Sequence, residues 1–364
     1  MSKKRLSLST VFLIICTLFF AISLLLYVVS LSSYAAADAI DHTVSRSLRD
    51  VLARLSAPFP FSVGEAVLVL LPLLTVGILW RLFRRFDDRR VRRGVLGTVL
   101  GVTLAVFSLF LLVLGVSYQT TPLEEKLALS AEPVSAEELQ TTARILLSMA
   151  ERELDAITFL EDGSSVMPYD LDTLSAHLAA AYDALAEDHS FVVAADARVK
   201  GITLSVPMSY MQILGVYFFF TGECNINMDY PDVERPFTAA HELAHRRGVG
   251  REDEAGMMAF LAGMRADDPY VRYSCTLTVY RYVASALYRA DRERYYAVCA
   301  EMDDRIRAEL AALSRHQRKY SGNLLGEVSS ELNDAYLKAN GTEGAVSYGL
   351  IVDLAVAYLA ASEP

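Results

Sequence analysis

The stretch PFTAAHELAHRRGVGREDEAG, residues 236–256, contains the pattern HELAH at residues 241–245. Residues four apart lie on the same face of an α-helix, so His241 and His245 can bind one metal ion there. Glu242 lies beside them and can accept a proton from an attacking water. Gly248 is placed to end the helix. The stretch therefore predicts a helix over 236–248 that carries a zinc site, with Glu242 as the catalytic general base.

A catalytic zinc site of this type needs a third protein ligand. The extended pattern HExxHxxGxxH would place a histidine at position 251, but the chain has Arg251, which cannot bind a metal. Of the next three acids, we expect Glu252 and Asp253 to occupy the exposed first turn of a second helix. Glu254 shares the apolar stripe of that helix with Met257, Met258 and Leu261. We therefore predict His241, His245 and Glu254 as the zinc ligands.

A simpler interpretation is a histidine pair on a helix surface next to solvated glutamates. The glutamate in the second position of the pattern, the glycine after the helix and the stripe position of Glu254 favour the metal site.

Three apolar segments lie in the first third of the 364-residue chain, and 53% of all residues are hydrophobic. They are Val11–Leu31, Val63–Phe83 and Val95–Ser117, each about as long as the ~20 residues that a membrane-spanning helix needs. The first exceeds the roughly 7 to 15 apolar residues of a signal peptide, so an uncleaved anchor is favoured over a cleaved leader. The sequence predicts a transmembrane anchor at 1–117, a linker at 118–133 and a folded domain at 134–364.

Basic residues set the expected orientation of these spans. Six arginines between residues 84 and 93 place the loop between the second and third spans in the cytoplasm. The loop 32–62 is then outside, although Arg46, Arg49 and Arg54 weaken that assignment. We predict a multi-pass protein of the cytoplasmic membrane whose C-terminal domain is extracytoplasmic. A fourth span over 202–220 is disfavoured by Pro207, Ser209 and Gln212.

The charge excludes nucleic acid as a partner. The net charge of the chain is −10, and the acidic excess lies after residue 117, where it would repel phosphate. Three cysteines in the C-terminal domain show no CxxC spacing, so a cysteine-based zinc site is not indicated, whereas one disulfide among them is left open. These residues are Cys224, Cys275 and Cys299.

Periodicity predicts a mainly α domain with a small sheet, of the α+β kind. Two helices are expected first, at 135–157 and 168–188, the former opened by a capping box at Ser135 and Glu138. Strands are expected at 201–207 and 214–227. Further helices are then expected at 236–248, 252–266, 269–290, 291–318, 326–339 and 345–361.

Several other residues are candidates for the site. If the stretch TGECNIN forms a sheet edge, Asn225 and Asn227 are candidate substrate contacts, because peptides can bind as an added strand. Tyr348 is the candidate donor to the oxyanion that forms during peptide hydrolysis. Asp353, in an apolar run, is either a partner that orients a zinc histidine or a helix cap or salt-bridge partner. Fainter candidates are Tyr320 and His316.

The chain resembles a bacterial membrane-protein family called domain of unknown function 3810. The stretches that carry the resemblance are SVPMSYMQILGVYFFFTGECNIN, PFTAAHELAHRRGVGREDEAG, YLKANG and VSYGLIVDLAVAYL. The resemblance implies a zincin-like metallopeptidase domain with a glutamate as third ligand, consistent with Glu254. In other glutamate-ligated zincins, Ala and then Asp or Asn follow that glutamate; this chain has Gly256 at the last place, and Arg246 where Gln is expected. Gly256 puts a hydrogen bond to a zinc histidine in doubt.

The sequence thus predicts a membrane-anchored, zinc-dependent peptidase that hydrolyses peptide or protein substrates. Charged residues around HELAH disfavour an intramembrane protease. The alternative is a non-catalytic membrane sensor or assembly factor whose metal site is structural.

Overall fold

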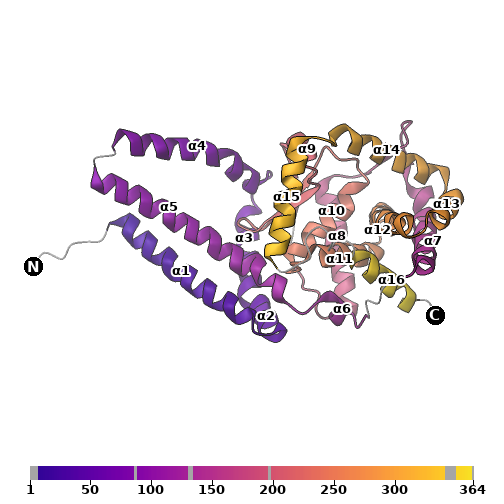
Figure 1. The fold of residues 1–364 in the computed structure, drawn as a ribbon, viewed down its shortest axis with the longest axis horizontal. Coiled ribbons are helices and arrows are strands. Elements are labelled where there is room, and N and C mark those ends of the chain that lie inside the picture. The colour runs from indigo at the N-terminus through magenta and orange to yellow at the C-terminus, as the bar shows by residue number, and fades with distance from the viewer. Residues whose placement is uncertain (1–6, 86–87, 130–133, 196–197, 341–349, 363–364) are drawn as a thin grey trace, which may run out of the picture. The chain divides into compact units, whose positions relative to one another are not determined.

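The computed structural model describes residues 7–85, 88–129, 134–195, 198–340 and 350–362. The chain forms two compact units (Figure 1). Unit 1 comprises residues 1–120 together with 218–222, and unit 2 comprises residues 121–217 and 223–364.

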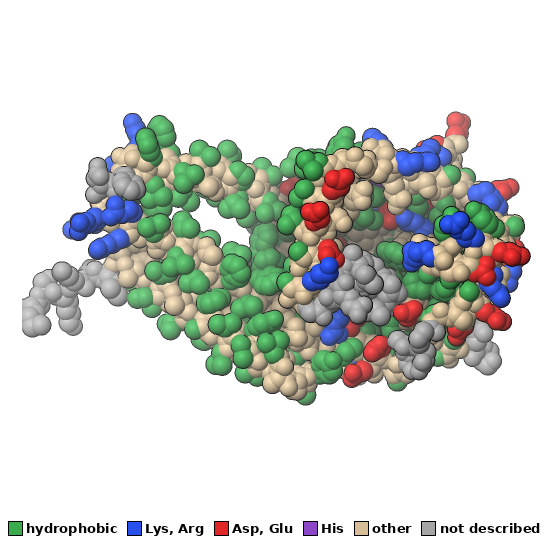
Figure 2. All heavy atoms as spheres, in the orientation of Figure 1, with side chains coloured by type: hydrophobic (Ala, Val, Ile, Leu, Met, Phe, Trp, Pro, Cys, Tyr) green, Lys and Arg blue, Asp and Glu red, His purple; other side chains and the backbone are tan. Residues whose placement is uncertain are grey.

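Unit 1 is helical throughout most of its described residues. Its elements are α1 (Leu8–Ser30), α2 (Tyr34–Ile40), the π-helix η1 (Asp41–Ser45), α3 (Arg46–Ser56), α4 (Val63–Arg84), α5 (Arg89–Phe110), the π-helix η2 (Leu111–Gly115) and the 3₁₀-helix η3 (Ser117–Gln119). Helices α1 and α5 pack along each other. Three helical stretches are long and apolar enough to cross a membrane: Leu8–Ser30, Val63–Arg84 and Arg89–Gln119. They lie where the three apolar segments predicted spans, and Figure 2 shows hydrophobic side chains along them.

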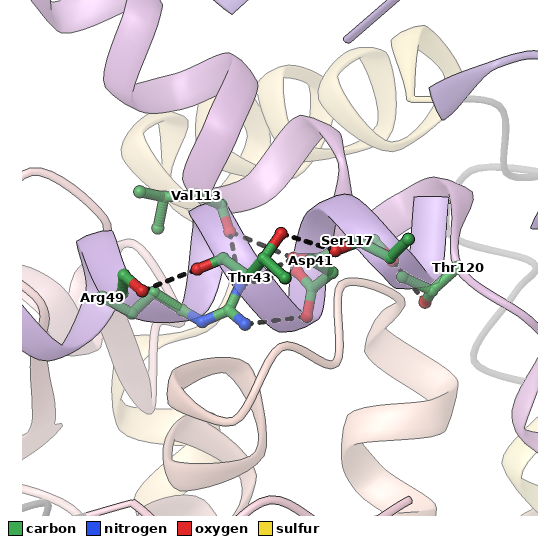
Figure 3. Close-up of polar contacts among 8 residues, drawn as sticks. Asp41, Thr43, Arg49, Val113, Ser117 and Thr120 are labelled. Carbon is green, nitrogen blue, oxygen red and sulfur yellow. Dashed lines mark hydrogen bonds and ion pairs between the residues drawn. The ribbon is translucent and has the colours of Figure 1, made fainter. Parts of the chain in front are cut away.

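A buried polar cluster joins the loop helices of unit 1 to the end of the third span (Figure 3). Arg49 on α3 donates two parallel hydrogen bonds, each 2.8 Å long, to the two carboxylate oxygens of Asp41. The hydroxyl of Ser117 donates to Asp41 Oδ1 at 3.0 Å, and Arg49 Nη1 also lies 3.4 Å from the carbonyl of Val113. Arg49 is only 1% exposed, and its charge is matched by Asp41, so it is not an exposed loop cation.

Unit 2 contains ten α-helices longer than four residues among its described residues, with two small sheets. The first half runs α6 (Leu123–Lys126), α7 (Ala136–Glu153), the 3₁₀-helix η4 (Leu154–Ala156), β1 (Thr158–Phe159), β2 (Ser165–Val166), α8 (Leu171–Asp188), β3 (Val199–Ile202), α9 (Ser205–Tyr210), β4 (Gly215–Phe218) and β5 (Glu223–Asn227). The second half runs α10 (Glu234–Arg246), α11 (Glu252–Met264), α12 (Pro269–Ala290), α13 (Arg292–Glu301), α14 (Asp304–Tyr320), α15 (Leu324–Ala339) and α16 (Leu350–Ser362).

The core of unit 2 lies where α10, α11 and α12 pack on one another. Helix α10 also packs on β5, the central strand of a three-stranded sheet in the order β3-β5-β4. Strands β3 and β5 are parallel, with Val199 opposite Cys224 and Ile202 opposite Asn227. Strands β1 and β2 form a separate antiparallel pair. The mainly helical domain with a small sheet is as predicted.

Local signals account for most boundaries. The predicted capping box is present: Ser135 Oγ accepts from the N–H of Glu138, and Glu138 accepts from the N–H of Ser135. The single strand expected over 214–227 is two strands, because Gly222 turns the chain with a φ of +70°. The single helix expected over 291–318 is two helices, because Asp303 caps a new helix by accepting from the N–H of Arg305.

Two other segments differ from expectation. Within 201–207 only the end of β3 is extended, and α9 follows at Ser205. Residues 202–220 contain short elements and no spanning helix, in agreement with the prediction against a fourth span. Part of the expected linker is ordered, since Leu123 begins the short helix α6 and is buried.

Candidate metal centre

Helix α10 positions both histidines of the HELAH pattern. Almost all of its residues are buried, because it packs between the sheet and helices α11 and α12. The rings of His241 and His245 lie edge to face one turn apart, with centroids 4.8 Å apart. Gly248 follows the helix with a φ of +98°, a conformation that glycine adopts without strain. This turn brings the carbonyl of Val249 to 2.7 Å from His245 Nδ1, which leaves Nε2 of that ring to face His241.

The two imidazoles converge with the carboxylate of Glu252, at the start of α11. The Nε2 atoms of His241 and His245 are 3.2 Å apart. Glu252 Oε2 lies 3.1 Å from His241 Nε2, and Glu252 Oε1 lies 3.6 Å from His245 Nε2. These three residues form a group that could hold a metal ion, with one donor atom from each within 4.8 Å of the others.

The spacing of these donors suits zinc. Ligands placed 2.0–2.1 Å from a tetrahedral zinc ion stand about 3.3 Å from one another. The two Nε2 atoms are 3.2 Å apart, close to that value, and each lies 3.1 or 3.6 Å from one of the two oxygens of Glu252. Two imidazole nitrogens and one carboxylate oxygen are also a donor set used by catalytic zinc sites. The residues present therefore form a group that could hold a metal ion, with a donor set that suits zinc.

The prediction of Glu254 as the third member of this group is wrong. Glu254 is buried, as its stripe position predicted, but its carboxylate faces other partners. Oε1 accepts from the N–H of Leu123 at 3.0 Å and from Arg251 Nη1 at 2.7 Å. Glu254 therefore ties the beginning of α6 to the beginning of α11.

The apolar stripe failed to select the right glutamate because α11 is buried on all sides. Every residue from Asp253 to Gly263 is buried, so the stripe does not distinguish the face toward the histidines. Glu252 is the least buried of the three acids, with a side chain 20% exposed, and it opens the helix directly after the turn at Gly248. The short distance in sequence between His245 and the first residue of α11 is a better guide than the apolar stripe, and it singles out Glu252.

Glu242, the predicted general base, is buried between α10 and strand β4. Its carboxylate accepts a hydrogen bond from the N–H of Tyr217 on β4. Burial raises the pKa of Glu242 to about 7, although the neighbouring imidazoles of His241 and His245 oppose this rise. A carboxyl group with such a pKa can both accept and donate a proton near neutral pH.

The charges within the metal group perturb one another in the absence of a metal. Burial lowers the pKa of His245, but the charge of Glu252 and a hydrogen bond to it outweigh burial and raise that pKa to about 9. Burial raises the pKa of Glu252, but the two imidazoles outweigh it and hold the pKa well below its ordinary value. Without a metal, these charges favour a protonated His245 beside an ionised Glu252.

Asn225 and Asn227 are not placed to contact a substrate. Both lie on β5, which is the central strand and not the edge, and both are buried. Asn227 Nδ2 donates to Ser209 and to the carbonyl of Ile213, and Asn225 Nδ2 donates to the carbonyl of Glu223. Their amides instead hold β5 and the loops beside it. The prediction of a sheet edge at TGECNIN is wrong, because β4 and β3 are the outer strands.

The remaining candidates lie elsewhere or outside the described residues. Tyr348 lies outside them. Asp353 is half-buried on α16, and burial raises the pKa of its carboxyl. The contacts described for the ring nitrogens of His241 and His245 are with Val249, Glu252 and each other, and not with Asp353. Tyr320 and His316 stack on each other at 5.1 Å in a separate aromatic cluster.

Gly256 serves packing. A Cβ atom there would come within 2.7 Å of Ile351 Cδ1 on α16, so the glycine lets α16 pack against α11. No side chain at this position can reach a histidine, and the carbonyl of Val249 holds His245 instead. All four cysteines are free thiols, so the disulfide left open by the sequence is not formed.

Comparisons with known proteins agree with the resemblance seen in the sequence. The family described as "Protein of unknown function (DUF3810)" matches residues 41–356, which include the third predicted span and the whole metal group. No curated protein and no solved structure matches the chain. The match covers most of the chain, which therefore belongs to the DUF3810 family.

Proposed function

We propose that this chain is a membrane-anchored, zinc-dependent peptidase with a zincin-like site. His241, His245 and Glu252 would bind the zinc ion, and Glu242 would act as the general base. The observation that carries this proposal is the convergence of His241 and His245 on α10 with Glu252 on α11, where one donor atom from each residue lies within 4.8 Å of the others. Helix α10 also carries Glu242.

Zinc with three protein ligands supplies a Lewis acid for the substrate carbonyl and lowers the pKa of water to about 7. Glu242 would accept a proton from the attacking water and return it to the departing amine. The carbonyl of Val249 would keep His245 in the tautomer whose Nε2 can bind the metal. For the group that donates a hydrogen bond to the oxyanion, Tyr348 remains the candidate predicted from the sequence.

An extended peptide is the substrate class that the sheet favours. Strand β4 is an outer strand, and its Tyr217 N–H contacts Glu242. Outer strands bind peptides by adding a strand, with backbone hydrogen bonds that tolerate many side chains. This role belongs to β4 and replaces the one predicted for Asn225 and Asn227.

The site would lie outside the cytoplasm and outside the lipid. The arginines between residues 84 and 93 favour a cytoplasmic turn between the second and third spans, and unit 2 would then lie on the opposite side. Arg49, which weakened this assignment, is paired with Asp41 inside unit 1. Helix α10 is not among the helices apolar enough to span a membrane.

The test uses the full chain, purified in detergent or nanodiscs. Elemental analysis should find about one zinc per chain, and a fluorogenic peptide library should reveal cleavage that a chelator abolishes. Glu242→Gln should retain zinc and reduce kcat by about 10²- to 10⁴-fold, the usual contribution of a general base.

The same experiment decides the alternative. A non-catalytic sensor or assembly factor with a structural metal would bind zinc and lose folding stability on chelation, yet it would cleave no peptide. Glu242→Gln would then leave its cellular function unchanged. That combination of results would contradict the peptidase.

A further inference from the structure

Strand β4 directs part of its backbone toward α10, the helix that carries His241, Glu242 and His245. The carbonyl of Leu214, just before the strand, accepts from the N–H of Asn227 at 2.7 Å, so this residue faces β5. Successive residues of a strand direct their backbone N–H and C=O groups to opposite sides. Gly215 and Tyr217 therefore direct theirs away from β5, and the N–H of Tyr217 donates to the carboxylate of Glu242.

Gly215 lies against the same carboxylate. A Cβ atom at this position would be 2.5 Å from Glu242 Oε1, 3.0 Å from Glu242 Cδ and 2.6 Å from Thr238 Cγ2. Carbon atoms at van der Waals contact stand about 3.5–4.0 Å apart, so a side chain at 215 requires something to move. Thr238 cannot rotate freely, because its hydroxyl donates to the carbonyl of Glu234 at 2.7 Å. Glu242 Oε1 is the nearest of these atoms and ends a flexible side chain, so its carboxylate would be displaced, while the strand would also have to shift away from the Cγ2 atom of Thr238.

We propose that β4 positions Glu242: the N–H of Tyr217 orients its carboxylate, and the missing side chain of Gly215 leaves the space that the carboxylate occupies. Gly215 is thus a positioning residue, and it acts on the reaction through Glu242. This inference rests on the proposed peptidase function for its kinetic consequence, although the contact itself does not depend on that function.

Gly215→Ala in the full chain tests the inference. We expect kcat to fall by about 10²-fold, because a displacement near 1 Å of a reacting group can have that effect. Zinc content should not change, since the atoms nearest to a Cβ at position 215 belong to Glu242 and Thr238, which are not among the proposed zinc ligands. The matched control is Gly77→Ala on α4, where an added Cβ meets nothing within 4 Å. A kcat for Gly215→Ala equal to that of the control would overturn the inference.

A second substitution separates positioning from damage to the fold. Glu242→Asp withdraws the carboxylate by one methylene group and relieves its contact with the methyl group introduced at position 215. Glu242→Asp should therefore lower kcat much less in the Gly215→Ala variant than it does in the wild type. If the fold-decrease in kcat of the double variant equals the product of the two single decreases, a direct contact between the two positions is contradicted.

A binding measurement keeps this test apart from the test of peptidase activity. A peptide hydroxamate binds a metal through its two oxygens and gives its proton to a nearby carboxylate. Its affinity for the cobalt-substituted full chain can be measured by visible absorption without turnover. Gly215→Ala and Glu242→Gln should both weaken it roughly tenfold or more, as expected for one lost charge-assisted hydrogen bond.

The outcomes are distinct. A wild type that cleaves no peptide, with hydroxamate affinity lowered equally in both variants, would sink the peptidase and retain the positioning role of β4. A wild type that cleaves peptides, with Gly215→Ala unchanged in kcat and in hydroxamate affinity, would retain the peptidase and sink the positioning role.

Discussion

The two units each contain a buried polar cluster, and the clusters differ in how their charges are satisfied. In unit 1, Arg49 and Asp41 face each other with two parallel hydrogen bonds of 2.8 Å, so a cation and an anion satisfy one another within the chain. In unit 2, His241, His245 and Glu252 direct electron-pair donors at a common point, with the two Nε2 atoms 3.2 Å apart. The first cluster is an ion pair within the chain, and the second is a group that could hold a metal ion.

This difference separates a structural ion pair from a ligand site. A bidentate arginine and carboxylate pair uses most of the donors and acceptors on both sides. In the second cluster the pairing depends on protonation: His245 Nδ1 faces the carbonyl of Val249, and whether His241 Nε2 donates or accepts depends on its tautomer. Burial increases the contrast, since unmatched groups in a protein interior are costly. The following substitutions break one cluster at a time.

The largest effect is expected for Glu252→Ala. Removal of one of three protein ligands should lower zinc affinity by at least about 1,000-fold, more than the 10- to 100-fold usual for a partner that only supports a ligand. The measurement is zinc content and competition with a chromophoric chelator. Glu254→Gln is the matched control, two residues away on the same helix, and should retain zinc. Zinc lost in Glu254→Gln and kept in Glu252→Ala would restore the ligand set first predicted from the sequence.

The next largest effect is expected for Arg49→Ala, which leaves Asp41 buried without its cation. The free energy of unfolding should fall by about 3–5 kcal/mol, measured by denaturation in a detergent or nanodisc. The exposed Arg54→Ala on the same helix should change it by less than about 0.5 kcal/mol. Zinc affinity should not change.

The double variant Arg49→Met with Asp41→Leu sharpens this result. Apolar replacement of both partners of a buried pair is often neutral, so stability should largely return. A double variant as unstable as Arg49→Ala would mean that the pair is not the source of the effect.

The pH dependence of the metal-free protein should show that the second cluster binds protons. His245 has a folded-state pKa raised to about 9, so its stabilising contribution is complete below an unfolded-state pKa of about 6.5 and is lost as pH rises through 9. The loss amounts to roughly 3 kcal/mol between these limits. The lowered pKa of Glu252 gives a contribution that is complete above about pH 4.3 and does not alter this window.

Denaturation of the chelator-treated full chain at pH 6 and pH 9.5 measures this slope. His245→Gln should flatten it, whereas the exposed His42→Gln should not. Added zinc should remove it in the wild type, because a metal-bound imidazole has no proton to lose. A slope that persists in His245→Gln would assign it to other groups.

The smallest effect is expected for Ser117→Ala, which removes the hydrogen bond to Asp41 Oδ1 and the 3.2 Å bond from Arg49 Nη1, but keeps both bonds between Arg49 and Asp41. Stability should fall by about 1–2 kcal/mol. Ser108→Ala is the control, since its buried hydroxyl donates to the carbonyl of Leu104 in its own helix. An equal loss in both variants would assign the effect to buried serines in general.

Much of this arrangement was predictable from local patterns. The three spans follow from uninterrupted apolar length, and helix α10 with its two histidines follows from spacing on a helix face. The capping box at Ser135 and the turn at Gly248 were also predicted, because caps and turns depend on residues close together in sequence. The two histidines of the metal group were therefore predicted correctly, and its third residue was not.

Contacts between distant segments could not be read in this way. Glu252 and Glu254 are two residues apart, but their partners come from different helices. The N–H of Leu123, at the start of α6, donates to Glu254, whereas His241 on α10 contacts Glu252. Asn225 and Asn227 were assigned to an edge because the sequence of a single strand does not show which strands pair with it. The strand that pairs with β5 on this side is β3, whose residues lie 25 positions earlier in the chain.

Composition and short-range spacing were enough to predict three helices long and apolar enough to span a membrane, a helical acidic domain and a helix that presents two imidazoles and Glu242. These features need only interactions within a few turns of helix or with the surrounding solvent and lipid. The approach of Glu252 to the two histidines, the pairing of Arg49 with Asp41 and the space at Gly215 were decided by packing of segments far apart in the chain. Their geometry depends on which surfaces meet in the folded core, and no single stretch of sequence contains that information.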